Sequence, residues 1–169
     1  MTEFYLIDAL KDFIQKVLNG EKLEAVVDDG LRPEGSLWET PDQHTEQSEL
    51  SDVKVYDGFL PPLEDSHVPF VYIRPTSATV NAGRTDLTVV LTVGVYAEDF
   101  KGYKDAMHVT RRITSALNSL KNNHLAKRFE RTNEMSWSWN ATDDTPYWSV
   151  DITTEWYIYT DVQTVEDFL

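Results

Sequence analysis

The stretch from residue 86 to residue 120 reads DLTVVLTVGVYAEDFKGYKDAMHVTRRITSALNSL, and its hydrophobic period changes once along its length. In the first half, large apolar residues occupy every second position, which is typical of a half-buried β-strand. These positions are Leu87, Val89, Leu91, Val93 and Val95. In the second half the period becomes three or four residues, which predicts a helix with one buried stripe. The stripe consists of Tyr103, Ala106, Thr110, Ile113, Leu117 and Leu120. We therefore expect a strand that turns and lays a helix back over its own sheet.

Length and composition restrict the class of protein. The chain has 169 residues, of which 41% are hydrophobic, and this predicts one globular domain over residues 1–169. It contains no cysteine, which excludes disulfides and thiolate chemistry. No apolar run is long enough to span a bilayer, and the charged N-terminal stretch does not resemble a signal peptide.

The net charge of −14 is the strongest compositional feature. Such a chain repels a phosphate backbone, because affinity for nucleic acid comes largely from Lys and Arg that displace counterions. General solubility explains the charge most simply. A second interpretation is a surface past which DNA moves without being held.

The N-terminal part predicts a helix followed by a long acidic segment. Thr2 is a suitable N-cap, and Asn19-Gly20 a suitable end for the helix. Its expected buried residues are Leu6, Ile7, Leu10, Phe13, Ile14, Val17 and Leu18. From Asp28 to Asp52 acids, prolines and glycines dominate, which predicts an acidic loop with Trp38 as its exceptional large aromatic residue. The C-terminal tail, residues 161–169, is expected to be loose.

The remaining apolar runs predict strands. Residues 53–60 read as a short strand and residues 68–74 as an interior strand that Pro75 interrupts. A long hairpin from Phe70 to Tyr96, with a wide tip over residues 76–85, should result. Residues 129–139 and 148–158 alternate strictly and predict a second hairpin, with its tryptophans packed in the core. The expected fold is α+β, a mostly antiparallel sheet with two helices on one face in the order α-β-β-β-α-β-β.

The sequence does not indicate an enzyme. The four histidines are far apart, no acidic cluster has the spacing of a known metal loop, and no nucleophile elbow or glycine-rich phosphate loop is present. The best polar cluster is His108 with Arg111 and Arg112 on the central helix, and a solvated or subunit-facing surface is the favoured explanation. We expect no catalytic residue, no cofactor and no metal.

Several ordered blocks resemble one family of phage proteins. They are VKVYDGFLPP, VPFVYIRP, LTVGVYAEDFKGYKDAMHVTRRITSAL, and MSWSW with PYWSVDITTEW. Together with the first helix they resemble the tail terminator, or tail-completion, proteins of tailed bacteriophages in prophages of Gram-positive bacteria. The motifs most specific to this family are Gly-Tyr-x-Asp at residues 102–105 and Pro-Tyr-Trp at residues 146–148. The acidic loop is longer than the family pattern leads us to expect.

The resemblance implies a structural virion protein. Such proteins assemble as a homo-oligomeric ring, expected to be a hexamer, on the head-proximal end of the tail tube. The ring stops tube polymerisation and joins the tail to the connector or stopper protein below the head, in the neck, and DNA passes through without specific binding. Assembly would take place in the host cytoplasm, without a membrane. An acidic lumen wall and closed head-to-tail contacts would suit this role.

Two groups of residues are candidate contacts. His108, Arg111 and Arg112 could contact the neighbouring subunit, with the arginines facing its carboxylates. Partner proteins could meet the acidic loop and the hairpin tip, and the candidate residues there are Trp38, Thr76, Asn81 and Arg84. Two other functions remain open: another neck component, such as a head-completion or connector protein, and a small-molecule or sugar-binding domain that uses the tryptophans.

Overall fold

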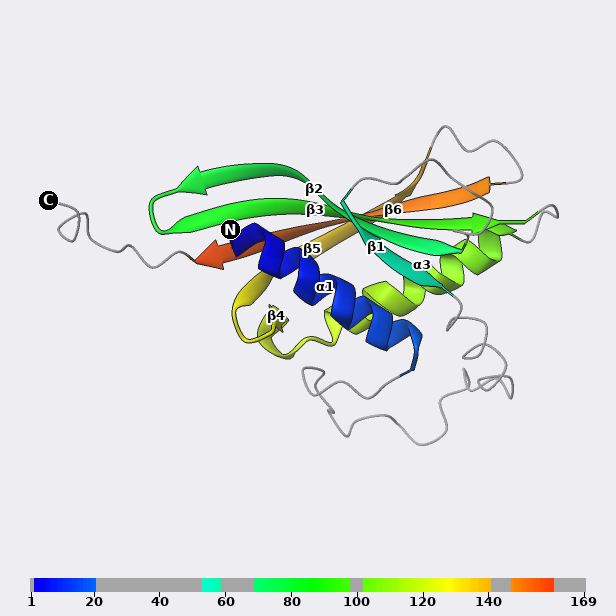
Figure 1. Cartoon of the computed structure of the whole chain (residues 1–169), viewed down its shortest axis with the longest axis horizontal. Coiled ribbons are helices and arrows are strands. Elements are labelled where there is room, and N and C mark those ends of the chain that lie inside the picture. Colours follow the sequence, from blue (N-terminus) through cyan, green and yellow to red (C-terminus); the bar gives the residue numbers. More distant parts are fainter. Residues whose placement is uncertain (1, 21–52, 59–68, 98–101, 141–146, 160–169) are drawn as a thin grey trace, which may run out of the picture.

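The computed structural model describes residues 2–20, 53–58, 69–97, 102–140 and 147–159 (Figure 1). The acidic loop 28–52, Trp38 and the tail 161–169 lie outside these residues. In chain order the elements are α1 (Thr2–Leu18), β1 (Lys54–Asp57), β2 (Phe70–Asn81), β3 (Arg84–Tyr96), α3 (Gly102–Asn118), the 3-10 helix η2 (Lys121–Asn123), β4 (His124–Leu125), β5 (Phe129–Trp139) and β6 (Tyr147–Tyr159). The fold is α+β, as the sequence predicts.

The six strands form one sheet in the order β1-β2-β3-β6-β5-β4. Among these strands β1 and β2 pair in parallel, and all other neighbours pair in antiparallel. The strand predicted from the alternation over residues 87–95 is β3, and it lies in the middle of the sheet. It pairs with β6 along its whole length, from Arg84 opposite Tyr159 to Tyr96 opposite Tyr147.

Both helices share one hydrophobic core with the inward-facing strand residues. Helix α1 packs against β1, β2 and α3, and α3 packs against β3 and β6 (Figure 1). The core includes Leu10, Ile14, Val89, Leu91, Ile113, Leu117, Val150, Ile152 and Trp156. The alternation predicted for residues 87–95 is confirmed, because each of those five apolar side chains is buried. Burial of apolar surface at about 25 cal/mol per Å² is the main force that holds the helices on the sheet.

The opposite face of the sheet has its own close packing. Phe70 lies over Gly94 on the neighbouring strand, and a Cβ atom at position 94 would collide with the Phe70 ring. Tyr72, two residues further along β2, is also buried. Glycine at position 94 therefore provides the space for an aromatic side chain on this face.

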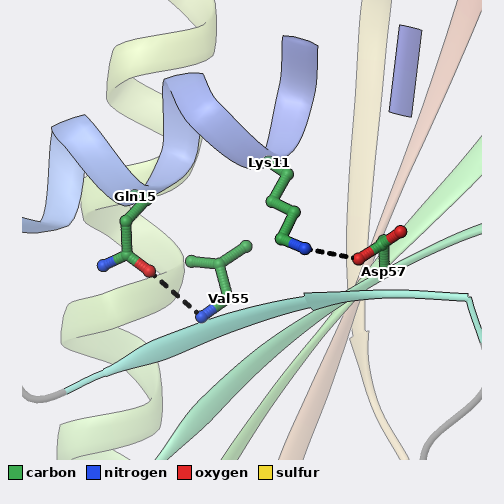
Figure 2. Close-up of polar contacts among 4 residues, drawn as sticks. All are labelled: Lys11, Gln15, Val55 and Asp57. Carbon is green, nitrogen blue, oxygen red and sulfur yellow. Dashed lines mark hydrogen bonds and ion pairs between the residues drawn. The ribbon is translucent and has the colours of Figure 1, made fainter. Parts of the chain in front are cut away.

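Polar contacts attach α1 to the outer edge of β1 (Figure 2). The Gln15 side chain donates a hydrogen bond to the Val53 carbonyl and accepts one from the Val55 N–H, both at 3.3 Å. Figure 2 shows the bond to Val55. Lys11 forms an ion pair with Asp57 at 2.6 Å. The amide of Gln15 thus satisfies backbone groups that would otherwise pair with another strand.

The expectation that Pro75 ends the strand, followed by a wide turn, is wrong. Strand β2 continues through Pro75 to Asn81, with a register shift between Pro75 and Ser77, and only Ala82 and Gly83 form the turn. Gly83 has a φ of 80°. Beyond Ile73 no described strand lies on the other side of β2, so proline removes no ladder hydrogen bond there. The result is a long hairpin, and its β3 strand stays paired with β6 as far as Arg84. We call the outer part of this hairpin, residues 76–88, the arm (Figure 1).

The sequence did not predict β4 and the segment around it. Four non-glycine residues in this segment have positive φ: Asn122 (54°), Asn123 (58°), Ala126 (51°) and Lys127 (58°). The last two are the central residues of the turn that joins β4 to β5 through residues 126–128, and a hydrogen bond of 3.2 Å from the Arg128 N–H to the Leu125 carbonyl closes this turn. A hairpin turn whose two central residues have positive φ favours Asn and Gly, so Ala and Lys at these positions lower the stability of the fold.

Candidate interaction surface

The described residues hold no metal site, since no three His, Asp or Glu side chains come together there. Their polar groups form local pairs instead. Arg84 forms an ion pair of 2.7 Å with Asp86 and lies over the Tyr157 ring, and Tyr159 donates a hydrogen bond of 2.9 Å to Glu130. These contacts tie neighbouring strands to one another on the face away from the helices.

The predicted cluster on α3 is exposed. His108, Arg111 and Arg112 all face away from the sheet, and their side chains make no hydrogen bond or ion pair within the described part of the chain. Lys104, one turn earlier, is exposed as well, and Asp105 is the single acidic residue of this helix. We call Lys104, His108, Arg111 and Arg112 the basic face of α3. It is free to meet a negatively charged surface.

The predicted tip residues lie on the arm and not in a loop. Thr76 and Asn81 are exposed on β2, and the Thr76 hydroxyl donates to the Thr88 carbonyl at 3.4 Å. Arg84 begins β3, and its guanidinium is occupied by Asp86 and Tyr157. The hydrogen bond that Arg84 donates to the Asp86 carboxylate raises the pKa of Arg84. These contacts connect β3 to β6 within the arm, and a role of Arg84 in partner binding stays a prediction.

An exposed aromatic group lies at the end of the sheet opposite the arm. Trp137 and Trp139 on β5 are 48% and 39% exposed, and Tyr103 at the start of α3 is 43% exposed. Trp148 lies between them, with its ring centre 6.4 Å from that of Trp139 and 6.4 Å from that of Tyr103. The prediction that Trp137 and Trp139 pack in the core is wrong. They lie on the helix side of the sheet, but α3 packs on β3 and β6 and leaves the C-terminal half of β5 exposed.

Arg131 is a buried cation that the sequence analysis missed. It is 2% exposed, and its Nη2 atom donates to the Asn118 side-chain oxygen at 3.0 Å and to that of Asn123 at 3.3 Å. The nearby carbonyl of Leu117 belongs to the last turn of α3, whose negative dipole end suits a cation. Burial lowers the pKa of Arg131. The residue joins the end of α3 to β5.

The candidates that the sequence predicted therefore fall on separate surfaces. The basic face of α3 and the arm are on different elements, and Trp38 lies outside the described residues. Strand β5 was predicted, but the exposure of its C-terminal half was missed, although one signal was present. Residues 135–139, MSWSW, contain no charged side chain, which is unusual for a strand exposed to water.

Charge is distributed unevenly along the chain. The described residues contain twelve Lys and Arg against ten Asp and Glu, whereas all other residues contain three against nineteen. The charge of −14 therefore comes from sequence outside the described elements. Within those elements the cations are slightly in excess.

Comparison of the chain with protein-family models gives no match, and comparison with curated protein sequences finds no significant relative. None of the described helices has the length and hydropathy that a membrane span requires.

Proposed function

We propose that this chain is a structural virion protein, a tail terminator that forms a ring on the head-proximal end of a phage tail tube. In this proposal the ring, with six copies as the expected number, stops tube polymerisation and joins the tail to the head connector. The chain catalyses no reaction and needs no cofactor. Its partners are other copies of itself, the tube protein and the connector protein in the neck of the virion.

The observation that carries the proposal is a sheet with open strand edges on opposite sides. Among the described strands, β2 lacks a neighbour beyond Ile73 and β5 lacks one beyond Glu130. Open edges tend to pair with other chains. A protein with two of them can associate head to tail, and such contacts form a ring where the rotation closes.

The sequence blocks that suggest the family also meet in the structure, which supports the proposal. Gly102, from the Gly-Tyr-x-Asp block, packs so tightly on the Trp148 indole that a Cβ atom would collide with it. Tyr103 contacts the same indole. The two blocks thus define one packing unit at the start of α3 and β6.

The charge distribution suits a part through which DNA passes. Negative charge repels the phosphate backbone, and in this proposal it comes from the nineteen acidic residues outside the described elements. The basic face of α3 is then available for acidic surfaces of neighbouring protein subunits, a pairing that guides association and selects the partner.

Two measurements test the proposal. Light scattering on the purified chain should give the mass of a closed oligomer, and negative-stain images of a mixture with tail tubes should show a ring on one tube end. Phage that lack the protein should produce tails of abnormal length that fail to join heads. A stable monomer, or normal tails in its absence, would disprove the assignment.

A second function has a specific observation in its favour. Trp137, Trp139 and Tyr103 expose aromatic rings, and both Trp139 and Tyr103 contact the Trp148 ring. Aromatic faces of this kind can stack on sugars. A sugar-binding domain should be a monomer whose tryptophan fluorescence changes on titration with oligosaccharides. Failure of a broad oligosaccharide set to change the fluorescence would remove this alternative.

A further inference from the structure

We infer that copies of this chain associate by pairing a specific segment of β2 in one copy with a specific segment of β5 in the next. The first segment, Ser77–Asn81, we call the arm edge, and the second, Met135–Trp139, the tryptophan edge. This inference depends on the proposed self-association and identifies the contact that would close the ring.

The two outermost strands of the sheet are already protected. Gln15 of α1 occupies the backbone groups of β1 (Figure 2), and β4 is only two residues long. Short edge strands and covered edges are the usual protection against pairing with other chains. The arm edge and the tryptophan edge have neither protection among the described residues.

The two segments match in length and composition. A register shift ends at Ser77 in β2, and another ends at Met135 in β5, so each strand continues from there with regular pairing for five residues. Neither segment contains a charged residue or a proline. All of Ser77–Asn81 is exposed, with Val80 at 77%, and so are residues 136–139. Uncharged, exposed edges of this kind favour pairing with another strand.

The apolar side chains of both segments lie on the same face of the sheet. Val80 is opposite Thr85, and Thr85 is buried on the helix side together with its inward neighbours. Trp137 is opposite the core residue Ile152, so it lies on the helix side as well. A sheet that continues from one copy to the next therefore places apolar side chains beside apolar ones, and such cross-strand pairs are stabilising.

Strand direction also permits the contact. Strands β2, β3, β6 and β5 alternate in direction, so β2 runs opposite to β5. A second copy in the same orientation thus presents its arm edge antiparallel to the tryptophan edge. Strand β1 borders β2 before the arm edge, and β4 borders β5 before the tryptophan edge. When the arm edge and the tryptophan edge pair in antiparallel, β1 and β4 lie at opposite ends of the paired segments and do not collide.

A two-fold contact between two arm edges would cover fewer of the exposed apolar side chains. It would cover Val80 but leave Trp137 and Trp139 exposed. The head-to-tail contact covers both sets of side chains. One register, which we use for the test, matches Val80 with Trp137, Ala78 with Trp139, Thr79 with Ser138 and Asn81 with Ser136.

Disulfide crosslinking tests the contact, because the chain has no cysteine of its own. The full-length Thr79→Cys/Ser138→Cys variant should form a ladder of covalent oligomers on mild oxidation, since directly opposite residues come close enough for a disulfide. Thr79→Cys/Ser136→Cys tests the neighbouring register. An equimolar mixture of Thr79→Cys and Ser138→Cys chains should stop at dimers, and each single variant alone should stay uncrosslinked.

The outcomes separate this contact from the proposed function. Dimers of Thr79→Cys alone would show two-fold pairing and overturn the inference. If the wild-type chain is a ring by light scattering but neither double variant crosslinks, the contact is wrong and the ring remains. A monomeric wild type would overturn both.

Charge placed on the arm edge gives a second readout. Val80→Lys should raise the dissociation constant of the oligomer at least about tenfold, because lysine on an edge opposes strand pairing. The matched control is Phe4→Lys on α1, where the replaced side chain is 73% exposed. Equal assembly of Val80→Lys and wild type would contradict the head-to-tail contact.

Discussion

At the scale of single residues, Tyr72 is a buried polar side chain whose hydroxyl has no hydrogen-bond partner among the described residues. The side chain lies on the sheet face away from the helices. Burial raises the pKa of this phenol, and the nearby Arg74 lowers it by a smaller amount. An unsatisfied buried polar group costs about 1–3 kcal/mol.

We predict that Tyr72→Phe is as stable as the wild type or more stable by about 1 kcal/mol at neutral pH, because it removes this hydroxyl. Above a pH of about 10, the unfolded tyrosine ionises before the folded one, so the wild type loses stability as the pH rises. The advantage of the variant should therefore grow in alkaline solution. Urea unfolding between pH 7 and pH 11 measures it, and parallel pH profiles would contradict the assignment.

The turn at Ala126 and Lys127 is a second feature at this scale. Both residues have positive φ, which costs roughly 1 kcal/mol for a residue with a Cβ atom. Asn and Gly adopt this conformation readily. The double substitution Ala126→Asn/Lys127→Gly should accordingly stabilise the fold by about 1–2 kcal/mol.

Thermal unfolding would measure this gain. Lys127→Ala is the control, because it removes the charge and keeps the backbone cost, and it should leave the melting temperature nearly unchanged. If the double variant is no more stable than the wild type, the positive φ angles of Ala126 and Lys127 do not cost the stability that we assign to them.

At the scale of elements, α1 has two roles. Its apolar stripe closes one end of the core, and its polar side chains occupy the edge of β1. The predicted stripe is confirmed, since all seven residues are buried, and so is the helix end, where Gly20 has a φ of 75°. The edge contact of Gln15 could not be predicted, because it depends on a strand 38 to 40 residues away.

We predict that Gln15→Ala lowers the free energy of unfolding by about 1–2 kcal/mol, since two backbone groups of β1 lose their partner. Lys16→Ala is the control on the same helix; Lys16 is exposed, and its loss should cost under about 0.5 kcal/mol. Urea unfolding of both variants decides between an edge contact and general helix propensity. Equal stability of the two would rule out a significant role for the Gln15 contacts.

At the scale of the whole molecule, the ordered elements and the rest of the chain differ in charge. The described residues carry a slight excess of Lys and Arg, and four cationic or titratable residues line the exposed face of α3. The acidic residues lie mainly in the sequence outside these elements. Complementary charge of this kind accelerates association and suppresses wrong partners, and salt weakens it.

We predict that Arg111→Glu/Arg112→Glu weakens ring assembly at least about tenfold, a change of about 1.4 kcal/mol, because like charges then meet at the interface. The control, Lys121→Glu/Lys127→Glu, changes the net charge equally at two exposed positions outside α3. Sedimentation or light scattering at several protein concentrations gives the comparison. Normal rings from the arginine variant would remove the basic face of α3 from the interface.

Local sequence determined the period of each element. Alternation over residues 87–95 and the three-to-four spacing over residues 103–120 specify a strand and a helix through the backbone geometry of each, whatever surrounds them. The α+β class and the inward faces of α1, β3 and β6 could be predicted for that reason. The absence of cysteine and the acidic composition are likewise properties of the sequence alone.

The tertiary structure alone decided which predicted faces are covered. Trp137 and Trp139 alternate as core residues do, yet they are exposed because α3 ends its coverage at β6. Pro75 lies within a strand because β1 stops at the residue opposite Ile73. Coverage and free edges depend on which segments become neighbours across long sequence distances, and a periodic pattern carries no information about the neighbour.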